Sequence, residues 1–361
     1  MNNSMFERRS TLEIFPDELF LELFSFIQPI DLYRGFINLN SRINHILNDT
    51  YICIHIINDD NSHDSQACLN YFAHQIIYLS IDCHPSCLSY EISLLSFPNL
   101  RSLHLPLPTD QQCDEITPIN LPFLTKLTIH NNAFKSVLFD KNSFPYLIAC
   151  CIPQIYSSIS HKMQSCLTLQ SLHIGSSSIV QLFQILPYVP NLIYLETILQ
   201  VNSRNIYPQS YIKHEKLSHF KVKLRKLRPD LEIILRSMPN LSRLEFLWNE
   251  PNQSYGERKS FDFDFFSSIL NYNVGSTLKH IDIDIRVSKC DEDIEQIRRI
   301  NLRWFSLLSK IVIRLGDTFF LTTRKLSTDA ENELITTLLQ STYITQRNAR
   351  FNRIKLDKVI K

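Results

Sequence analysis

The 361-residue chain lacks several features that whole classes of protein require. It has only five glycines, and they do not form a Gly-rich loop that could cradle a phosphate. No run of about 18 apolar residues occurs, so the sequence predicts no membrane-spanning helix. The nine cysteines lack the dense, regular spacing of a secreted disulfide scaffold, and Cys150 directly precedes Cys151. This usage is typical of a reducing compartment.

An excess of charge of either sign is also absent. The formal net charge is only +1, which gives no global attraction to nucleic acid or to acidic lipid. We therefore expect neither a membrane nor a nucleic acid as partner. The first ten residues carry Asn2, Asn3, Glu7, Arg8 and Arg9, where a signal peptide would need an apolar core. The expected location is cytoplasmic or nuclear.

Catalytic signatures are missing as well. No Cys-His or Ser-His pairing stands in a recognisable catalytic context. One cluster contains several possible metal ligands, namely His63, Cys68, His74, Cys83, His84 and Cys87. Its spacing lacks the paired arrangement that a zinc site needs, so we interpret these residues as buried thiols and surface histidines. The sequence predicts no catalytic residue, no metal ligand and no cofactor, and the protein is not expected to be an enzyme.

Regularly spaced apolar residues are what the chain does contain. Hydrophobic residues make up 44% of it, and many fall in the pattern L-x-x-L-x-L, which returns about every 24 residues from Ile76 to Leu241. After Leu241 the spacing lengthens across a polar segment, 249–259, which is either an inserted loop or a loop that contacts a partner. The ten cores of the pattern are 76–81, 100–105, 124–129, 147–152, 169–174, 192–197, 217–222, 241–246, 278–283 and 308–313.

Each core alternates apolar and polar residues, which predicts a short strand. Helical patterns lie between some of the cores, for example at Ile179–Val189 and Leu231–Met238. A strand and a helix in every 20 to 29 residues is the signature of leucine-rich repeats, whose units stack to bury a continuous core. The expected fold class is α/β, with a curved leucine-rich-repeat solenoid built on a parallel sheet.

The segment before the repeats predicts three short helices. Pro16 and Asp17 mark the start of the first helix, Asp31 is expected to cap the second, and Asn40 or Ser41 to cap the third. Fewer than about 40 residues seldom support an independent core, so another surface must cover part of the apolar faces. That surface is either the first repeat, which the helices would cap, or a separate protein.

A resemblance favours the second possibility. The run Leu12–Ile27, followed by Ile30–Leu32 and Leu39–Leu47, resembles an F-box. In that family the segment docks on the adaptor of SCF-type cullin-RING ubiquitin ligases, and the rest of the chain selects the substrate. The resemblance implies a substrate receptor whose partners are the SCF adaptor, the cullin assembly and an unknown protein substrate. The implied adaptor-binding residues are Pro16, Leu19, Leu23, Leu32 and Leu39.

The predicted organisation has five parts. They are a flexible N-terminus at 1–11, the F-box-like module at 12–49, a linker and capping strand at 50–75, the solenoid at 76–325, and a C-terminal helix with a basic tail at 326–361. The tail is either a solvated helical face or a binding segment for localisation or an acidic partner.

Substrate-binding residues follow from the strand alternation. Polar residues between the buried strand positions share one face, the concave face in leucine-rich repeats. The candidates on it are His104, Lys126, His173, Tyr194, His219, Lys221, Lys223 and Arg243. Lys221, Lys223 and Arg243 could also receive a phosphate-bearing motif. The alternative to a ligase receptor is a leucine-rich-repeat scaffold or interaction protein unrelated to ubiquitin.

Overall fold

The computed structural model describes most of the chain between residues 14 and 323, and the chain divides into two compact units at 1–150 and 151–361. The described residues are 14–56, 63–82, 91–129, 144–154, 164–200, 213–224, 229–249, 268–269, 277–287, 308–315 and 318–323. The predicted N-terminus at 1–11, the loop at 250–259 and the C-terminal helix and tail at 326–361 lie outside these ranges. We describe each unit by itself.

The first unit begins with three helices, as the sequence predicts. They are α1 (Asp17–Phe26), α2 (Pro29–Phe36) and α3 (Ser41–Asn48). The Asn40 side chain caps α3 by accepting a hydrogen bond from the backbone N–H of Ile43 at 2.7 Å. The expected cap at Asp31 is wrong. Helix α2 starts two residues earlier because Pro29 fits its first turn, and Asp31 lies inside that turn.

The three helices share a small aromatic and aliphatic core. Phe20, Phe24 and Leu32 are buried, and the rings of Phe24 and Phe36 meet edge to face with centroids 5.0 Å apart. The Arg42 guanidinium, on α3, also binds the Asp17 carboxylate at 2.5 Å. The start of α1 is thereby tied to α3.

A strand and an additional helix follow. Strand β1 (Ile52–Ile56) lies where the capping strand is expected, but α4 (His63–Tyr71) occupies part of the segment interpreted as a linker. Its apolar periodicity is weak, so the sequence did not indicate it. Arg34 of α2 binds Asp64 of α4 at 2.8 Å, and the Tyr33 and Tyr71 rings lie 6.0 Å apart. Helices α2 and α4 therefore hold each other.

Parallel strands in chain order form the rest of the first unit. Strand β1 pairs with β2 (Ile76–Ile81), β2 with β3 (Ser102–Leu105), and β3 with β4 (Lys126–Ile129). The 3₁₀ helix η3 (Leu94–Ser96) and α5 (Asp110–Glu115) occupy the connections. Strand β5 (Ala149–Gln154) spans the division between the units.

The second unit continues the pattern. Strands β6 (Ser171–Ser177), β7 (Tyr194–Leu199), β8 (His219–Leu224), β9 (Arg243–Asn249), β10 (His280–Val287) and β11 (Leu308–Leu315) pair in parallel in chain order. Strand β12 (Thr318–Thr323), which the sequence did not indicate, pairs antiparallel with β11. All ten predicted cores are strands, and the α/β class with a parallel sheet is confirmed.

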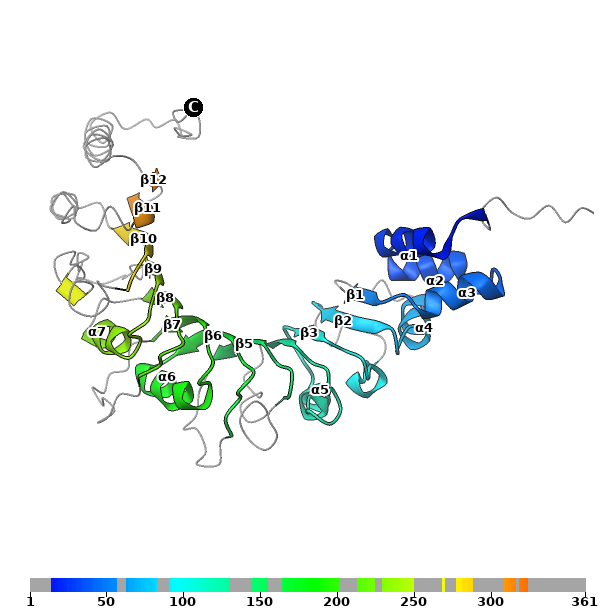
Figure 1. Ribbon diagram of the computed structural model, residues 1–361, viewed down its shortest axis with the longest axis horizontal. Helices are drawn as coiled ribbons and strands as arrows, with labels where there is room; N and C mark the ends of the chain where they lie inside the picture. The colour runs from blue at the N-terminus through cyan, green and yellow to red at the C-terminus, as the bar shows by residue number, and fades with distance from the viewer. Residues whose placement is uncertain are drawn as a thin grey trace, which may run out of the picture. The chain divides into compact units, whose positions relative to one another are not determined.

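Helices cover one face of the second unit's strands. Helix α6 (Ile179–Ile185), the 3₁₀ helix η4 (Leu186–Tyr188) and α7 (Pro229–Arg236) match the two helical segments predicted, and Figure 1 shows α6 and α7 along the same face. Alternate strand residues such as Leu195, Phe220 and Leu244 are fully buried on that side. The intervening residues stay partly exposed on the other side, which is therefore the free face of the sheet.

A recurring Pro-Asn-Leu sequence links the chain just before three strands, β3, β7 and β9, to the chain just before the neighbouring strand. The side-chain amides of Asn99, Asn191 and Asn240 donate to the backbone carbonyls of His74, Leu167 and Glu215 at 2.7, 2.6 and 2.8 Å. Each bond spans 24 or 25 residues, close to one spacing of the apolar pattern. The asparagine thus satisfies a carbonyl of the preceding turn of chain and helps to fix the register. Over the described ranges, no helix is both long enough and apolar enough to span a membrane.

Candidate functional site

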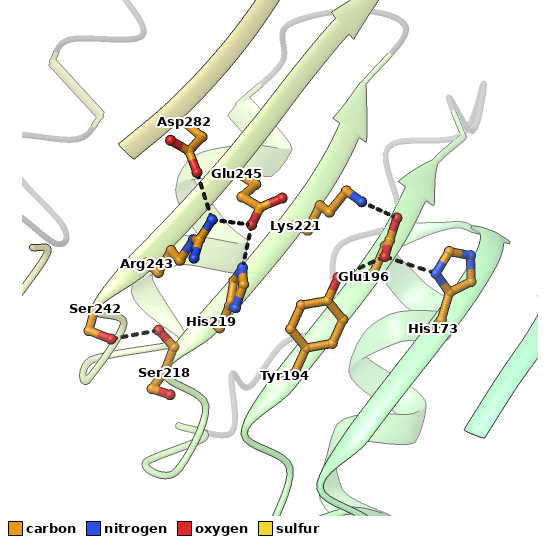
Figure 2. A network of polar contacts seen from close by, with 10 residues as sticks. All are labelled: His173, Tyr194, Glu196, Ser218, His219, Lys221, Ser242, Arg243, Glu245 and Asp282. Atoms are coloured by element: carbon orange, nitrogen blue, oxygen red, sulfur yellow. Dashed lines mark hydrogen bonds and ion pairs between the residues drawn. The ribbon is translucent and has the colours of Figure 1, made fainter. Parts of the chain in front are cut away.

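The free face of β6 to β10 carries a connected set of polar side chains, drawn in Figure 2. Strand register aligns them in two rows across the sheet. One row contains Tyr194, His219 and Arg243, and the other contains His173, Glu196, Lys221, Glu245 and Asp282. Because neighbouring parallel strands lie about 4.8 Å apart, side chains at the same register come within bonding distance. We call this set the polar network.

Glu196 is the centre of one half of the polar network. Its carboxylate accepts hydrogen bonds from the His173 imidazole at 3.0 Å, the Tyr194 hydroxyl at 2.7 Å and the Lys221 amine at 2.8 Å. Figure 2 shows the three donors around it. The pKa of Glu196 would rise through burial alone, but the bonds from Lys221, Tyr194 and His173 outweigh burial and lower it. Glu196 is therefore ionised at neutral pH.

The other half of the polar network is built on Glu245. Its Oε1 lies 2.9 Å from His219 Nε2 and 3.0 Å from the guanidinium nitrogen Nη2 of Arg243. The same Nη2 lies 2.9 Å from Oδ2 of Asp282. Burial and the nearby Arg243 charge lower the pKa of His219, although Glu245 and Asp282 oppose this. The imidazole is thus neutral at pH 7 and donates its N–H to Glu245.

An aromatic contact links the two halves. The Tyr194 and His219 rings meet edge to face with centroids 4.6 Å apart. Burial, followed by the hydrogen bond to Glu196, raises the pKa of Tyr194, so its hydroxyl stays protonated and remains a donor. The result is a rigid surface of mixed charge that offers a ring edge, imidazole nitrogens and paired ions to a partner.

The sequence-predicted binding residues separate into three groups. His173, Tyr194, His219, Lys221 and Arg243 come together in the polar network. Lys223 lies on the same face of β8, two residues beyond Lys221. His104 and Lys126 belong to the first unit, where His104 is partly exposed on β3 and Lys126 is exposed on β4.

The carboxylates of the polar network were absent from the candidate set. Glu196, Glu245 and Asp282 nevertheless bind both permanent cations of the network, Lys221 and Arg243. A signal existed for Glu196 and Glu245, since each stands one apolar residue away from a candidate on its own strand, Tyr194 and Arg243. The strand register that pairs them with neighbouring strands was the missing information.

A phosphate site at the three predicted cations receives no support from this geometry. Lys221 is bound to Glu196, and Arg243 is bound to Glu245 and Asp282. A phosphate would have to displace carboxylates that already satisfy these two cations. We therefore discard the interpretation of Lys221, Lys223 and Arg243 as one phosphate-binding group.

A smaller cluster lies on the free face of the first unit. Asp82 follows β2 and accepts from His55 of β1 and from His104 of β3, the second at 3.0 Å. Burial would raise the pKa of Asp82, but the hydrogen bond to His55 and the His104 charge lower it. Of the three residues only His104 was a predicted candidate. The other two were missed because the cluster depends on the pairing of three strands.

The N-terminal helices expose most of the residues implied to bind an adaptor. Pro16 is exposed, and the exposed fractions of Leu19, Leu23 and Leu39 are 47%, 43% and 58%. Leu32 differs from them, because its side chain is 0% exposed, and its implied role in adaptor binding stays a prediction. Other exposed apolar side chains in this segment are Ile14, Phe15 and Phe26.

The described residues do not favour thiol or metal chemistry. Burial raises the pKa of Cys68 to about 12 and that of Cys151 to about 11, so both thiols are protonated and weakly nucleophilic at neutral pH. Among the residues with described placement, no group of three or more His, Cys, Asp or Glu side chains is arranged to hold a metal ion.

Comparison of the chain with known proteins adds no assignment. No protein-family model matches it, and no curated protein matches it significantly.

Proposed function

We propose that the protein is a substrate-receptor subunit of an SCF-type cullin-RING ubiquitin ligase. Helices α1 to α3 would form an F-box that binds the adaptor, and the strands that follow would form a curved leucine-rich-repeat solenoid that holds a protein substrate. The chain would act by binding alone, without a catalytic residue or cofactor, in the cytoplasm or the nucleus. Other subunits would transfer ubiquitin.

Exposed apolar side chains on the N-terminal helices carry this proposal. Leu19, Leu23 and Phe26 face solvent on α1, although Phe20 and Phe24 of the same helix are buried. Helix α1 therefore has apolar side chains both on its buried side and on its exposed side. Large exposed apolar surface on a folded module marks a protein-binding site. The F-box resemblance of the same residues identifies the SCF adaptor as the partner.

The free face of the sheet supports the substrate-binding half of the proposal. Its side chains stand on paired strands and are held by mutual hydrogen bonds, as Glu196 and Glu245 illustrate. Pre-ordered groups lose little conformational entropy when they bind a partner. A rigid surface of mixed polarity suits recognition of a specific protein.

Co-purification with the adaptor tests the proposal. The full chain should bring the adaptor through two successive affinity steps, and the double variant Leu19→Asp with Leu23→Asp should lose it. Glu22→Gln, an exposed change on the same helix, is the matched control and should retain it. Failure of the wild-type chain to bind the adaptor would defeat the ligase assignment.

A scaffold function unrelated to ubiquitin is the second candidate. The contacts between α2 and α4, through Arg34–Asp64 and Tyr33–Tyr71, are those expected if the helices cap the sheet. A scaffold predicts that the chain from residue 50 onward stays soluble only with the helices attached, and that no adaptor binds. The adaptor experiment separates the two functions.

A further inference from the structure

A third row of side chains crosses the free face of the second unit beside the polar network. Register aligns Ile198 of β7, Lys223 of β8 and Leu247 of β9. All three are partly exposed, and they alternate with buried neighbours, so they lie on the same face as the network. The row places one cation between two aliphatic side chains.

Lys223 differs from the other cations of this face. Lys221 binds Glu196, and Arg243 binds two carboxylates. Within the described part of the chain, the Lys223 amine makes neither an ion pair nor a hydrogen bond. The residues at its register on both neighbouring strands are aliphatic and offer no acceptor. Its charge is therefore available to a bound partner.

We propose that Lys223, with Ile198 and Leu247, forms a subsite for the bound protein. The segment that it binds has an acidic residue with an aliphatic residue on either side of it. This inference rests on the proposed function, since it specifies the substrate class for the same face. The carboxylate would accept a charge-assisted hydrogen bond from the Lys223 amine. The aliphatic flanks would cover Ile198 and Leu247 and exclude water from that bond.

The charges nearby favour a carboxylate over a phosphate. The polar network holds three carboxylates, Glu196, Glu245 and Asp282, against two permanent cations, Lys221 and Arg243. These five charges sum to one excess negative charge, which repels an anion at longer range. A phosphate dianion is best bound by more than one cation, and among the described residues of this face Lys221 and Arg243 are already bound to carboxylates.

Geometry specifies the spacing of the ligand. Neighbouring strands lie about 4.8 Å apart, and side chains on one side of an extended peptide recur about every 6.6 Å. An extended peptide that crosses β7, β8 and β9 presents alternate residues to the sheet, so positions i−2, i and i+2 are those nearest to Ile198, Lys223 and Leu247, and the side chains must span the difference in spacing. The probe is a fluorescein-labelled, C-terminally amidated peptide Leu-Ser-X-Ser-Leu, with X as Glu, Gln, phosphoserine or Lys. Blocked ends remove the terminal charges.

Fluorescence anisotropy on the purified full chain tests the subsite. We expect the Glu peptide to bind about tenfold more tightly than the Gln peptide, the effect of one charge-assisted contact. Lys223→Met keeps the aliphatic stem and should abolish this preference, and Lys223→Glu should reverse it in favour of the Lys peptide. Lys213→Met, an exposed change outside β8, should leave the preference intact. Circular dichroism verifies that each variant is folded.

Four results would overturn the inference. They are no binding of the Glu peptide up to about 1 mM, equal affinity for Glu and Gln, survival of the Glu preference in Lys223→Met, and tighter binding of the phosphoserine peptide than of the Glu peptide. Adaptor co-purification does not involve Lys223, so it reports on the ligase assignment independently. Adaptor binding without a Glu preference would reject the subsite alone.

Discussion

His219 and Glu245 face each other across β8 and β9, with Nε2 of the imidazole 2.9 Å from Oε1 of the carboxylate. The contact joins a neutral donor to a charged acceptor, because burial and Arg243 lower the pKa of His219. Both side chains are only 22% exposed, so neither can exchange its partner for water without rearrangement. The protonation state of His219 is therefore coupled to folding.

Acid should destabilise the protein through His219. Its pKa is below 6.5 in the folded state and near 6.5 in the unfolded state, so the unfolded state binds the proton more readily. Stability is then fully present above about pH 6.5 and decreases as the pH falls toward the folded pKa. His219→Gln keeps a side-chain donor and should flatten this dependence. Urea unfolding at several pH values measures it, and equal slopes for the wild type and the variant would contradict it.

Removal of the Glu196 charge should weaken the second unit. Glu196→Gln loses the ion pair with Lys221 and weakens the contacts with Tyr194 and His173, which should cost about 1–2 kcal/mol of unfolding free energy at pH 7. The pKa of Glu196 is lowered on folding, so its contribution is present above about pH 4.5 and is lost as the pH falls through the folded pKa. The wild type and the variant should converge in acid.

Glu215→Gln provides the control for this measurement. Glu215 is exposed just before β8 and makes no side-chain ion pair within the described ranges. Its substitution should change the unfolding free energy by less than about 0.5 kcal/mol. A difference between wild type and Glu196→Gln that persists unchanged at pH 3 would mean that packing, rather than charge, explains the loss.

The strands could be predicted from the sequence because their signal is local. Buried positions such as Leu195 and Phe220 recur with period two inside a spacing of about 24 residues, which is enough to locate the strand and its free face. The pairing of His173 and Lys221 on Glu196 needs the register of three strands. No local pattern contains that register, so the network's cations were predicted without their partners.

Amphipathic position alone could not separate buried from exposed apolar residues in the N-terminal helices. Leu32 and Leu39 both lie in the segment that resembles an F-box, but Leu32 is fully buried and Leu39 lies in the turn between α2 and α3. Helix α4, which contacts α2, was not expected at all. The side of α2 that becomes buried depends on such long-range neighbours.

Replacement of two glycines by alanine should change the melting temperature in opposite directions. A Cβ added at Gly175 of β6 would overlap the backbone carbonyl of Pro153 on β5, and backbone atoms cannot move aside cheaply. Gly35 of α2 has no atom within 4 Å of the added Cβ, and alanine is a better helix former by about 1 kcal/mol. Gly175→Ala should lower the melting temperature and Gly35→Ala should raise it. Stabilisation by Gly175→Ala would contradict the close approach of β5 and β6.

Alanine substitutions at Leu32 and Leu39 should distinguish an effect on stability from an effect on adaptor binding. Leu32 is fully buried, so Leu32→Ala should cost about 2–5 kcal/mol of unfolding free energy through lost packing and a cavity. Leu39 is 58% exposed, and Leu39→Ala should leave the unfolding free energy within about 0.5 kcal/mol of the wild type. Chemical unfolding of the full chain measures both effects.

The same pair sharpens the adaptor assignment. If Leu39 lies in the interface, Leu39→Ala should weaken adaptor binding without loss of stability, because it removes apolar surface that only the complex buries. Leu32→Ala should act on binding only through unfolding, so lowering the temperature should restore its affinity. Titration calorimetry at two temperatures separates these cases. If the Leu32→Ala chain is fully folded and still does not bind the adaptor, Leu32 contributes directly to the interface.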